Sequence, residues 1–197
     1  MSKKLIIVGS GNAALCAGIS ALEKGATVKI LEKANKYLAG GNTKYTAGAM
    51  RFVYNNGDEL KPLLKDPYDP KLEKTKFGQY TKEKFSEDLL NFNDGKPLTI
   101  EQKTLINESY ETMKWLSSHD VKFEPIYQRQ SFEKDGKFIF WGGLTLASKN
   151  EGVGLFDQEL EAFKKLGGKI EYETSVTELL REEGKIIGVK TKNNNFI

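Results

Sequence analysis

The first part of the chain alternates between short apolar runs and turns marked by glycine. Residues 5–8, "LIIV", are four consecutive apolar positions closed by Gly9, a pattern typical of a parallel strand buried on both faces. Residues 13–24 carry apolar side chains at helical spacing, Gly25 follows them as a C-cap, and residues 27–31 form a second apolar strand. The order strand, glycine turn, helix and strand predicts a βαβ unit with a right-handed crossover.

Three more helices are predicted after residue 52. The first contains Phe85, and the second begins at a capping box in which Thr99 precedes Gln102 by three positions. The third covers "GVGLFDQELEAFKKLGG" and ends at its last two glycines. Phe85, Leu89 and Phe92 are predicted to share one face of the first helix, and Phe156, Leu160 and Phe163 one face of the third. The second helix is predicted to carry four residues inward, Leu105, Ile106, Met113 and Leu116.

Strands are predicted in four later segments, "VKFEPI", "KFIFWGGLTL", "KIEYETSV" and "GKIIGVKTKN". A tight turn at Glu183 and Gly184 joins the last pair. The segment "KDPYDPKLEK" contains Asp-Pro turn signals and is expected to be an exposed loop. Together with the βαβ start, these elements predict an α/β protein.

Composition narrows the class of protein. With 197 residues, 39% of them hydrophobic, the chain can bury a core of one domain or slightly more. The 30 Lys and Arg are scattered among 27 Asp and Glu, so charge gives no support to nucleic-acid binding. The single cysteine, Cys16, forms no intrachain disulfide, and one His with one Cys predicts no metal site. The N-terminal apolar run is too short for a signal peptide or a membrane span, so a cytoplasmic protein is expected.

The glycine turn carries the first chemical signal. "GSGNAA" fits the pattern G-x-G-x-x-A on Gly9, Gly11 and Ala14, between a strand and a helix. In such a turn the first glycine permits the bend, the second lets the backbone approach a pyrophosphate, and Ala14 lets helix pack on strand. Glu32 lies about 20 residues further on, where an acid accepts hydrogen bonds from ribose hydroxyls and repels a 2′-phosphate. The alternative is that these glycines only turn the chain between a strand and a helix.

A second segment with few large side chains, "GGNTKYTAGAM", favours FAD over NAD as the predicted ligand. An NAD-binding unit would continue from its second strand into a helix, whereas this chain enters an irregular stretch of small and polar residues. Gly40 and Gly41 are expected to turn beneath the pyrophosphate, and Asn42 and Thr43 to hydrogen-bond there. The remaining small residues, which we expect to lie flat near an isoalloxazine ring, are Ala47, Gly48 and Ala49.

These two motifs carry a family resemblance. "GSGNAALCAGISALEKGATVKILEK" followed by "GGNTKYTAGAMRF" resembles the FAD-dependent oxidoreductases of the fumarate reductase and succinate dehydrogenase flavoprotein group. Within that group, "GNAALCA" and "YTAGAMRFVY" are most similar to the tricarballylate dehydrogenase subfamily. The resemblance continues in "GGLTLASKNEGVGLFDQELEAFKKLGGKIEYETSVTELL" and so extends almost to the end of the chain.

The resemblance implies a Rossmann-like FAD-binding domain and a set of cofactor contacts. It places Gly48 close to a bound dicarboxylate as well, and Val176 beside the adenine. Many relatives carry a second glycine where this chain has Ala49. Combined with the glycine motif, the predicted FAD-binding residues are Gly9, Gly11, Asn12, Ala13, Ala14, Glu32, Lys33, Gly40, Gly41, Asn42, Thr43, Ala47, Gly48, Ala49 and Val176.

The resemblance also implies what the sequence does not contain. In relatives a capping domain follows about where this sequence ends, and the chain then returns to complete the FAD domain; the catalytic Arg and His belong to those parts. We therefore expect residues 1–197 to be the N-terminal part of an FAD-binding domain. It would comprise the βαβ unit and flavin loop (1–52), a helical and irregular insertion (53–150) and a returning helix with strands (151–197). Catalytic residues remain unassigned, and the chain alone is expected to be inactive.

The function implied is that of the FAD-binding portion of an oxidoreductase acting on the CH-CH bond of a small di- or tricarboxylate, similar to tricarballylate, fumarate or succinate. Hydride would pass between a substrate carbon and the flavin. Two alternatives stay open, namely a non-catalytic nucleotide-binding module and an NAD-dependent dehydrogenase fragment. The expected partners are the carboxylate substrate and either a second polypeptide that supplies the remaining half or an electron-transfer partner, with no nucleic acid and no membrane span.

Overall fold

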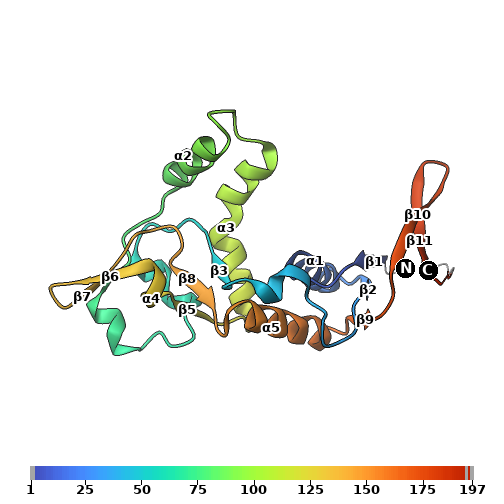
Figure 1. Cartoon of the computed structure of the whole chain (residues 1–197), viewed down its shortest axis with the longest axis horizontal. Coiled ribbons are helices and arrows are strands. Elements are labelled where there is room, and N and C mark those ends of the chain that lie inside the picture. Colours follow the sequence, from blue (N-terminus) through green and yellow to red (C-terminus); the bar gives the residue numbers. More distant parts are fainter. Residues whose placement is uncertain (1–2, 194, 196–197) are drawn as a thin grey trace. The chain divides into compact units, whose positions relative to one another are not determined.

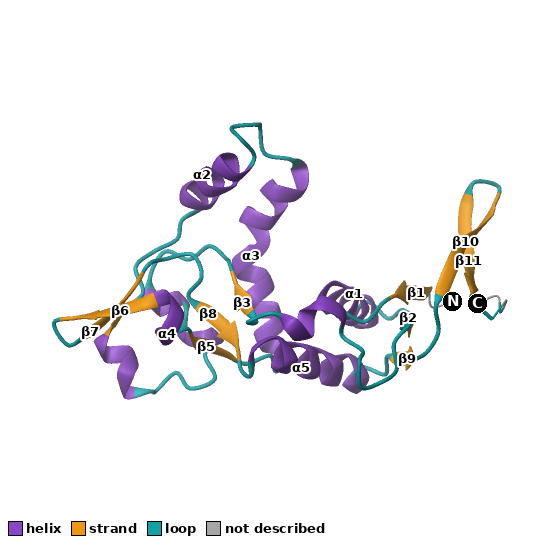
Figure 2. Ribbon diagram, in the orientation of Figure 1, coloured by secondary structure: helices purple, strands orange, loops and turns teal. Residues whose placement is uncertain are grey.

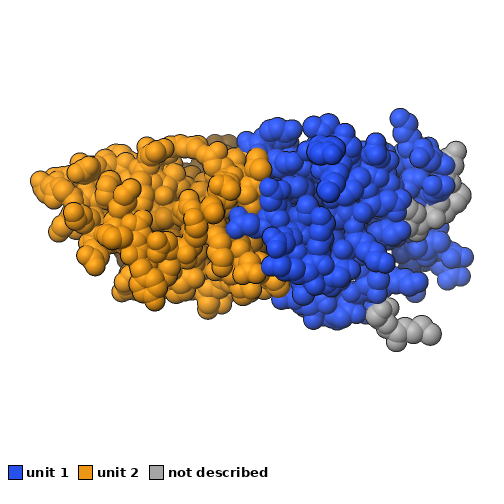
Figure 3. Space-filling view, turned by 90° about the horizontal axis from the view of Figure 1, so that it is seen from below, with its two compact units in different colours: residues 1–45, 155–197 blue, residues 46–154 orange. Residues whose placement is uncertain are grey.

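The computed structural model describes residues 3–193 and 195. The chain forms two compact units, which Figure 3 shows in different colours. The first unit consists of residues 1–45 and 155–197, and the second of residues 46–154. The second unit is therefore an insertion between two parts of the first along the chain.

A small parallel sheet organises the first unit (Figure 1). Its strands are β1 (Lys4–Val8), β2 (Thr27–Leu31) and β9 (Lys169–Glu171), in the order β1-β2-β9. Helix α1 (Asn12–Glu23) links β1 to β2, and both neighbouring strand pairs are parallel. Helix α5 (Glu151–Lys165) precedes β9. The predicted βαβ unit is present, with element bounds close to those expected.

The first strand is not buried on both faces, and that prediction is wrong. Leu5 is 41% exposed and Val8 is 54% exposed. In the part of the chain that the structure describes, β1 pairs with β2 alone and is an edge strand, so its apolar side chains lack neighbours on one side. Strand β2, which lies between two others, does bury Val28, Ile30 and Leu31.

Helices α1 and α5 pack closely at a glycine. A Cβ on Gly18 of α1 would lie 2.6 Å from Cε2 of Phe163 on α5, so no larger residue fits there without displacement. Leu15, Ile19 and Phe163 have no exposed surface. The helical spacing predicted for both segments is thus realised as one apolar contact between two helices.

The last two strands form a hairpin. Strand β10 (Val176–Glu182) pairs antiparallel with β11 (Lys185–Thr191). Glu183 and Gly184 have φ values of 47° and 76°, the left-handed pair that a two-residue type I′ turn requires. The predicted turn is confirmed, whereas the predicted strand "KIEYETSV" is split, because β9 ends at Glu171 and β10 begins at Val176.

Two further sheets build the second unit (Figure 2). The antiparallel sheet β3-β8-β5 and the mixed sheet β4-β7-β6 include the predicted segments "VKFEPI" and "KFIFWGGLTL", the latter divided between β7 and β8. Three of the six strands, Ala49–Met50, Thr75–Lys76 and Ser131–Lys134, were not predicted, because so short a run has little period of its own. The bounds are β3 (Ala49–Met50), β4 (Thr75–Lys76), β5 (Phe123–Pro125), β6 (Ser131–Lys134), β7 (Lys137–Phe140) and β8 (Leu146–Ser148).

In the second unit, the starts of the helices were predicted more accurately than the burial of their side chains. Thr99 and Gln102 form the capping box at the start of α3, with both reciprocal hydrogen bonds present. Leu105 is exposed, contrary to prediction, and on the predicted face of α2 Phe85 is buried while Phe92 is exposed. The loop predicted at "KDPYDPKLEK" contains one 3-10 turn. The helical bounds are α2 (Lys82–Phe92), α3 (Ile100–Ser118) and α4 (Tyr127–Gln130), and the 3-10 turns of the chain are Gly41–Tyr45, Gly57–Glu59, Lys61–Leu63 and Pro70–Lys74.

A buried tyrosine ties the core of the second unit together. The Tyr54 hydroxyl donates to the carbonyl oxygen of Phe77 at 3.0 Å, and it lies 2.7 Å from Oγ1 of Thr145. Because the single phenolic proton is used at Phe77, the Thr145 hydroxyl donates to Tyr54. Both polar side chains are completely buried and satisfied.

Across residues 3–193, the helices are all too short or too polar to span a bilayer.

Candidate functional site

The glycine turn of the first unit opens onto a pocket of about 330 Å³. The turn after β1 forms one wall, the end of β2 a second, and the segment that leads into β10 a third. The parallel register puts the carboxyl ends of β1 and β2 side by side, which is where ligands bind in open α/β sheets. The lining residues are Val8, Gly9, Ser10, Gly11, Leu31, Glu32, Lys33, Gly41, Thr174, Ser175 and Val176.

A buried carboxylate holds the turn in place. Oε2 of Glu32 accepts hydrogen bonds from the backbone N–H of Ser10 at 2.9 Å and from its hydroxyl at 2.6 Å. Oε1 accepts from the backbone N–H of Ala34 at 2.8 Å. A carboxylate oxygen can accept two hydrogen bonds, so Oε1 keeps capacity for a ligand hydroxyl. Glu32 therefore fixes the glycine turn to the end of β2 while it borders the pocket.

The second glycine segment packs against the first within this unit. Gly40 N–H donates to the Ser10 hydroxyl oxygen at 3.2 Å, and Asn12 N–H donates to Oγ1 of Thr43 at 2.9 Å. A Cβ on Gly11 would lie 3.3 Å from that same Oγ1, tighter than most packed contacts. The stretch predicted to be irregular is a short 3-10 turn from Gly41 to Tyr45. Ser10 thus bonds to Glu32 and Gly40 at once, a link that the G-x-G-x-x-A pattern does not specify.

The backbone geometry of this pocket fits a dinucleotide. Gly9 has φ +91° and Gly41 has φ +54°, and a Cβ on either would meet nothing within 4 Å, so both face open space. Helix α1 starts at Gly11 without a side-chain cap or an acid in its first turn, as far as the described chain shows. The Asn12 N–H is bonded to Thr43, and the Ala14 N–H donates to the Gly11 carbonyl at 2.9 Å. The feature of α1 that favours an anion such as a pyrophosphate is therefore mainly its positive dipole end.

Tyr172, which follows β9, has a polar atom without a partner. Its hydroxyl is buried and makes no hydrogen bond to any described residue. Burial raises the pKa of Tyr172 first, and the Glu32 charge raises it further. Tyr172 is not among the residues that line the glycine-turn pocket, so its hydroxyl is not placed to contact a ligand there.

The structure brings together part of the predicted FAD-binding set. Six of its members line the pocket: Gly9, Gly11, Glu32, Lys33, Gly41 and Val176. Three brace the pocket through hydrogen bonds: Asn12, Gly40 and Thr43. Ala13, Ala14 and Asn42 lie beside it without lining it. The lining residues that sequence reasoning missed are Val8, Ser10, Leu31, Thr174 and Ser175. The "TS" before the last hairpin gave no signal of its own. Direct contact of any of these residues with FAD stays a prediction.

The predicted ring-contacting residues lie in the second unit. Ala47 and Ala49 line a pocket of about 490 Å³ there. Between them Gly48 is buried with φ +64°, and a Cβ on it would sit 2.7 Å from the carbonyl carbon of Glu151. Only glycine fits this position, because both the backbone angle and the space exclude a side chain. The remaining lining residues are Lys71, Glu124, Pro125, Ile126, Tyr127, Gln128, Arg129, Gln130, Leu144, Ala147, Ser148, Asn150 and Glu151.

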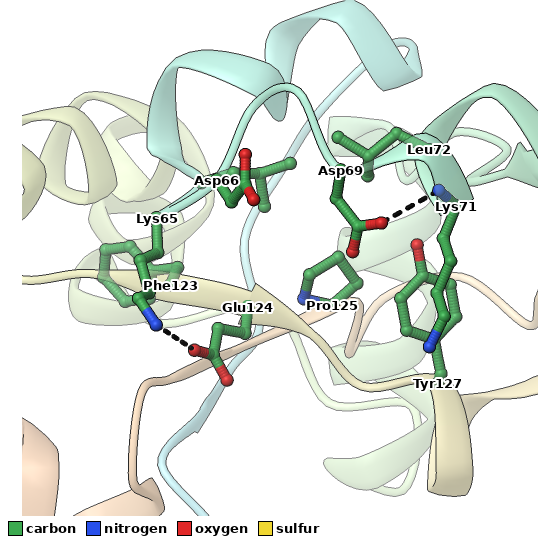
Figure 4. A pocket seen from close by; sticks show the side chains of 10 residues that line it. Lys65, Asp66, Asp69, Lys71, Leu72, Phe123, Glu124, Pro125 and Tyr127 are labelled. Atoms are coloured by element: carbon green, nitrogen blue, oxygen red, sulfur yellow. Dashed lines mark hydrogen bonds and ion pairs between the residues drawn. The ribbon is translucent and has the colours of Figure 1, made fainter.

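A neighbouring pocket of about 320 Å³ shares Lys71, Glu124, Pro125 and Tyr127 with the previous one. Figure 4 shows that charged side chains, among them Lys65, Asp69 and Glu124, line it together with the rings of Phe123, Pro125 and Tyr127. Lys65 Nζ pairs with Glu124 at 3.7 Å, and Asp69 accepts the backbone N–H of Lys71 at 2.9 Å (Figure 4). The charges of this pocket are largely balanced within it, so it gives no evidence for a particular ligand. No cluster of three metal-ligating side chains occurs among the described residues.

Arg51, which follows β3, is held by two partners. Its NH1 donates to the Tyr80 hydroxyl at 2.8 Å and to Asp88 at 3.3 Å, and Tyr80 donates to Asp88 at 2.6 Å. Burial and then Asp88 raise the pKa of Tyr80 to about 12, and the hydrogen bond from Tyr80 lowers the pKa of Asp88. The Tyr80 hydroxyl therefore stays protonated and Asp88 charged near neutral pH. This trio fixes structure and lines none of the three pockets above.

A buried acid lies between the two packed helices of the first unit. Glu159 on α5 is completely buried, and its Oε1 lies 3.7 Å from the thiol sulfur of Cys16 on α1. Its Oε2 has no partner among the described residues. Burial raises the pKa of Glu159 to about 8, while burial and then Glu159 raise the pKa of the half-buried Cys16. Cys16 is thus held as an unreactive thiol, and Glu159 is protonated at neutral pH.

Comparison with known proteins identifies the ligand class. Residues 4–76 match the family model of the FAD binding domain. The chain is 28% identical over 201 aligned positions to urocanate reductase from Eggerthella lenta, covering 96% of this chain and 28% of that protein. It is 36% identical over 63 positions to fumarate reductase (cytochrome) from Shewanella frigidimarina, covering 32% of this chain and 11% of that protein. The chain therefore spans less than a third of the length of these relatives.

The fold is also that of solved flavoproteins. The open conformation of a flavocytochrome c3 fumarate reductase superposes with a TM-score of 0.65 at 20% identity, over 96% of this chain and 30% of that one. The predicted FAD-binding α/β fold and its cofactor, FAD, are confirmed. The findings support the fumarate reductase and succinate dehydrogenase flavoprotein family and, with it, a family of oxidoreductases. The narrower assignment to tricarballylate dehydrogenase stays a prediction.

Proposed function

We propose that the chain is the FAD-binding portion of an oxidoreductase that acts on a carbon–carbon bond of a small carboxylate. The observation that carries the proposal is the pocket at the carboxyl ends of β1 and β2, where Gly9, Gly11 and Glu32 converge. This pocket lies mainly within the segment that matches the FAD-binding family, residues 4–76. Bound FAD supplies a centre that accepts or releases a hydride, which is the chemistry of such a bond change.

The contribution of this chain is to bind and orient. The positive dipole end of α1 and the open backbone at Gly9 and Gly41 would hold the pyrophosphate. Oε1 of Glu32 would accept a ribose hydroxyl, while the bonds from Oε2 to Ser10 keep the turn rigid. In the second unit, Ala47 and Ala49 would leave room for the ring, because neither carries a side chain beyond Cβ.

The substrate class is proposed from the similar proteins. Urocanate and fumarate, after which the two similar reductases are named, share a carbon–carbon double bond conjugated to a carboxylate. We propose this unit, or its saturated product, as the reacting part of the substrate. The finer proposal is a di- or tricarboxylate similar to tricarballylate, fumarate or succinate. The proposal includes oxidoreductase activity of the enzyme to which this chain contributes. It also includes a second polypeptide or an electron-transfer partner, and a cytoplasmic location.

One observation favours a second candidate, a nucleotide-binding module without catalysis. In the described part of the pocket lining of the first unit, Glu32 and Lys33 are the titratable side chains, and Glu32 is occupied with the glycine turn. No acid–base pair is therefore placed to move a proton at a substrate carbon in that pocket. Turnover separates the two candidates, and FAD binding alone does not.

The test is a titration of the purified chain with FAD, followed by quenching of flavin fluorescence and confirmed by ultrafiltration. We expect binding in the wild type, at least tenfold weaker binding in Glu32→Gln, and none in Gly11→Val, whose side chain would fill the approach beside Thr43. Glu161→Gln, on α5 of the same unit and paired with Lys165 outside the pocket lining, is the matched control and should bind as the wild type does. Equal affinity in all four proteins, with unchanged circular dichroism, would remove the pocket from the proposal.

A further inference from the structure

Arg129 occupies a distinctive place in the second unit. It lies on the single turn of α4 and lines the same pocket as Ala47 and Ala49. Its guanidinium NH2 forms an ion pair with Oε1 of Glu151, at the start of α5. The pocket, at about 490 Å³, is in the size range of small-molecule sites.

The other arginines of the chain are placed differently. Arg51 is committed to Tyr80 and Asp88 and does not line this pocket. Arg181 lies on β10 of the first unit. Among the described residues of the second unit, Arg129 is therefore the guanidinium that faces this cavity, and a guanidinium binds carboxylates in a two-pronged geometry that an ammonium does not offer.

The partner of Arg129 is easily exchanged. Both side chains of the pair are more than half exposed, at 60% for Arg129 and 57% for Glu151. Exposed pairs of this kind contribute little to stability, because water solvates both charges nearly as well when they separate. A carboxylate from a ligand can therefore replace the Glu151 carboxylate without disturbing the fold.

The backbone holds Glu151 beside the predicted ring-contacting segment. Asn150 and Glu151 have φ values of 63° and 56°, two successive left-handed residues without a glycine, which is a strained arrangement. The strain is held by hydrogen bonds from Gly152 N–H to the Thr46 carbonyl at 3.0 Å and from the Ser148 hydroxyl to the Glu151 carbonyl at 2.7 Å. Glu151 is thus fixed to the chain segment that begins at Thr46.

We propose that Arg129 binds a carboxylate of the substrate in this pocket, and that Glu151 occupies Arg129 until the substrate displaces it. The inference rests on the proposed function, because it assigns the pocket of Ala47 and Ala49 to the substrate of that oxidoreductase. Ser148, Gln128 and Gln130 line the same pocket and offer polar groups to a second oxygen-bearing end of the ligand. The ligand is thus a small carboxylate, and Arg129 is the residue that binds and positions it.

The experiment measures carboxylate binding directly on the purified chain, with and without FAD, by saturation-transfer NMR. The probes are succinate, fumarate and tricarballylate, with sulfate as the competing inorganic anion. We expect Arg129→Gln to weaken binding about tenfold or more, since one charge-assisted contact is lost. Glu151→Gln should tighten binding severalfold, because the competing carboxylate is gone. Arg129→Lys should recover only part of the affinity, and Arg181→Gln should leave it unchanged.

Unchanged affinity in Arg129→Gln would show that Arg129 does not bind the carboxylate, and would overturn the site. Unchanged or weaker affinity in Glu151→Gln would show that Glu151 does not compete with the ligand for Arg129. Sulfate that competes as well as succinate shows a general anion site and also overturns the assignment. A chain that binds FAD but no carboxylate refutes this inference and leaves the proposed FAD-binding role standing. Arg129-dependent carboxylate binding in a chain that fails to bind FAD refutes the proposed function and leaves the site standing.

Discussion

The buried acid between α1 and α5 predicts a specific loss of stability as pH rises. Glu159 has no exposed surface, its Oε1 meets only the Cys16 thiol, and its Oε2 has no partner in the described chain. An ionised carboxylate in such a place loses its hydration and gains no compensating cation. The folded protein therefore keeps the proton, and ionisation of Glu159 favours the unfolded chain.

The size of the effect follows from the pKa of Glu159, about 8 in the folded chain against an ordinary value of 4.5. Because the folded-state pKa is the higher one, the full stability is present below pH 4.5, declines as pH rises, and reaches its minimum above pH 8. Linkage gives at most about 1.4 kcal/mol per pH unit within this window. Between pH 5 and pH 7 the wild type should lose about 2.5 kcal/mol of unfolding free energy through this group alone.

The assay is urea unfolding at half-unit steps from pH 5 to pH 8, followed by far-ultraviolet circular dichroism. Glu159→Gln keeps the shape of the protonated acid and cannot ionise, so the difference between wild type and this variant isolates the group. Glu161→Gln is the matched control on the same helix, where the acid is exposed and paired with Lys165. A local readout comes from hydrogen exchange in α1 and α5, compared between variants at the same pH.

The expected result is a difference between wild type and Glu159→Gln that grows by about 2.5 kcal/mol from pH 5 to pH 7, with no such trend in Glu161→Gln. A difference that stays flat across this range would show that the folded protein accepts the ionised carboxylate without cost. The reasoning from burial and the missing partner would then be wrong.

Three smaller predictions concern packing. Gly18→Val forces its side chain against the Phe163 ring and should destabilise the first unit by about 1–3 kcal/mol in thermal or urea unfolding. The control is Ala17→Val, on the exposed face of the same helix. Gly25→Ala would be a poor control, because the φ of Gly25 is positive. Thr145→Val leaves the buried Tyr54 hydroxyl with one partner fewer and should cost about 1–3 kcal/mol, of which Tyr54→Phe in the same chain should restore part, measured by a double-mutant cycle. Gly48→Ala should perturb the turn at Ser148 and abolish the response of bound flavin to carboxylates while FAD still binds, as seen in visible absorbance; an unchanged response would contradict the tight fit at this glycine.

Local signals in the sequence were sufficient where a short-range rule governs the structure. The type I′ turn at Glu183 and Gly184, the capping box at Thr99 and the βαβ start all depend on neighbours along the chain. Their physics is contained in a few consecutive residues. These features could therefore be predicted with their residue numbers.

Features that depend on what lies across space were harder to predict. The exposed face of β1 depends on the absence of a second neighbouring strand in the described chain, which no pattern within "LIIV" reveals. Thr174 and Ser175 reach the glycine-turn pocket only because α5 and β9 return to the first sheet. The exposed Phe92 and Leu105 show that helical spacing fixes which residues share a face, and tertiary packing decides whether that face is covered.

The insertion of one unit within the other sets an order of events during synthesis. The pocket walls at Gly9 and Glu32 leave the ribosome early, but the wall at Thr174 to Val176 is made only after the whole second unit. Closing that wall requires a contact between residues far apart in the sequence, which is slow to form. The nucleotide site is thus completed only after the second unit has been synthesised, and until then the pocket at the glycine turn lacks one of its walls.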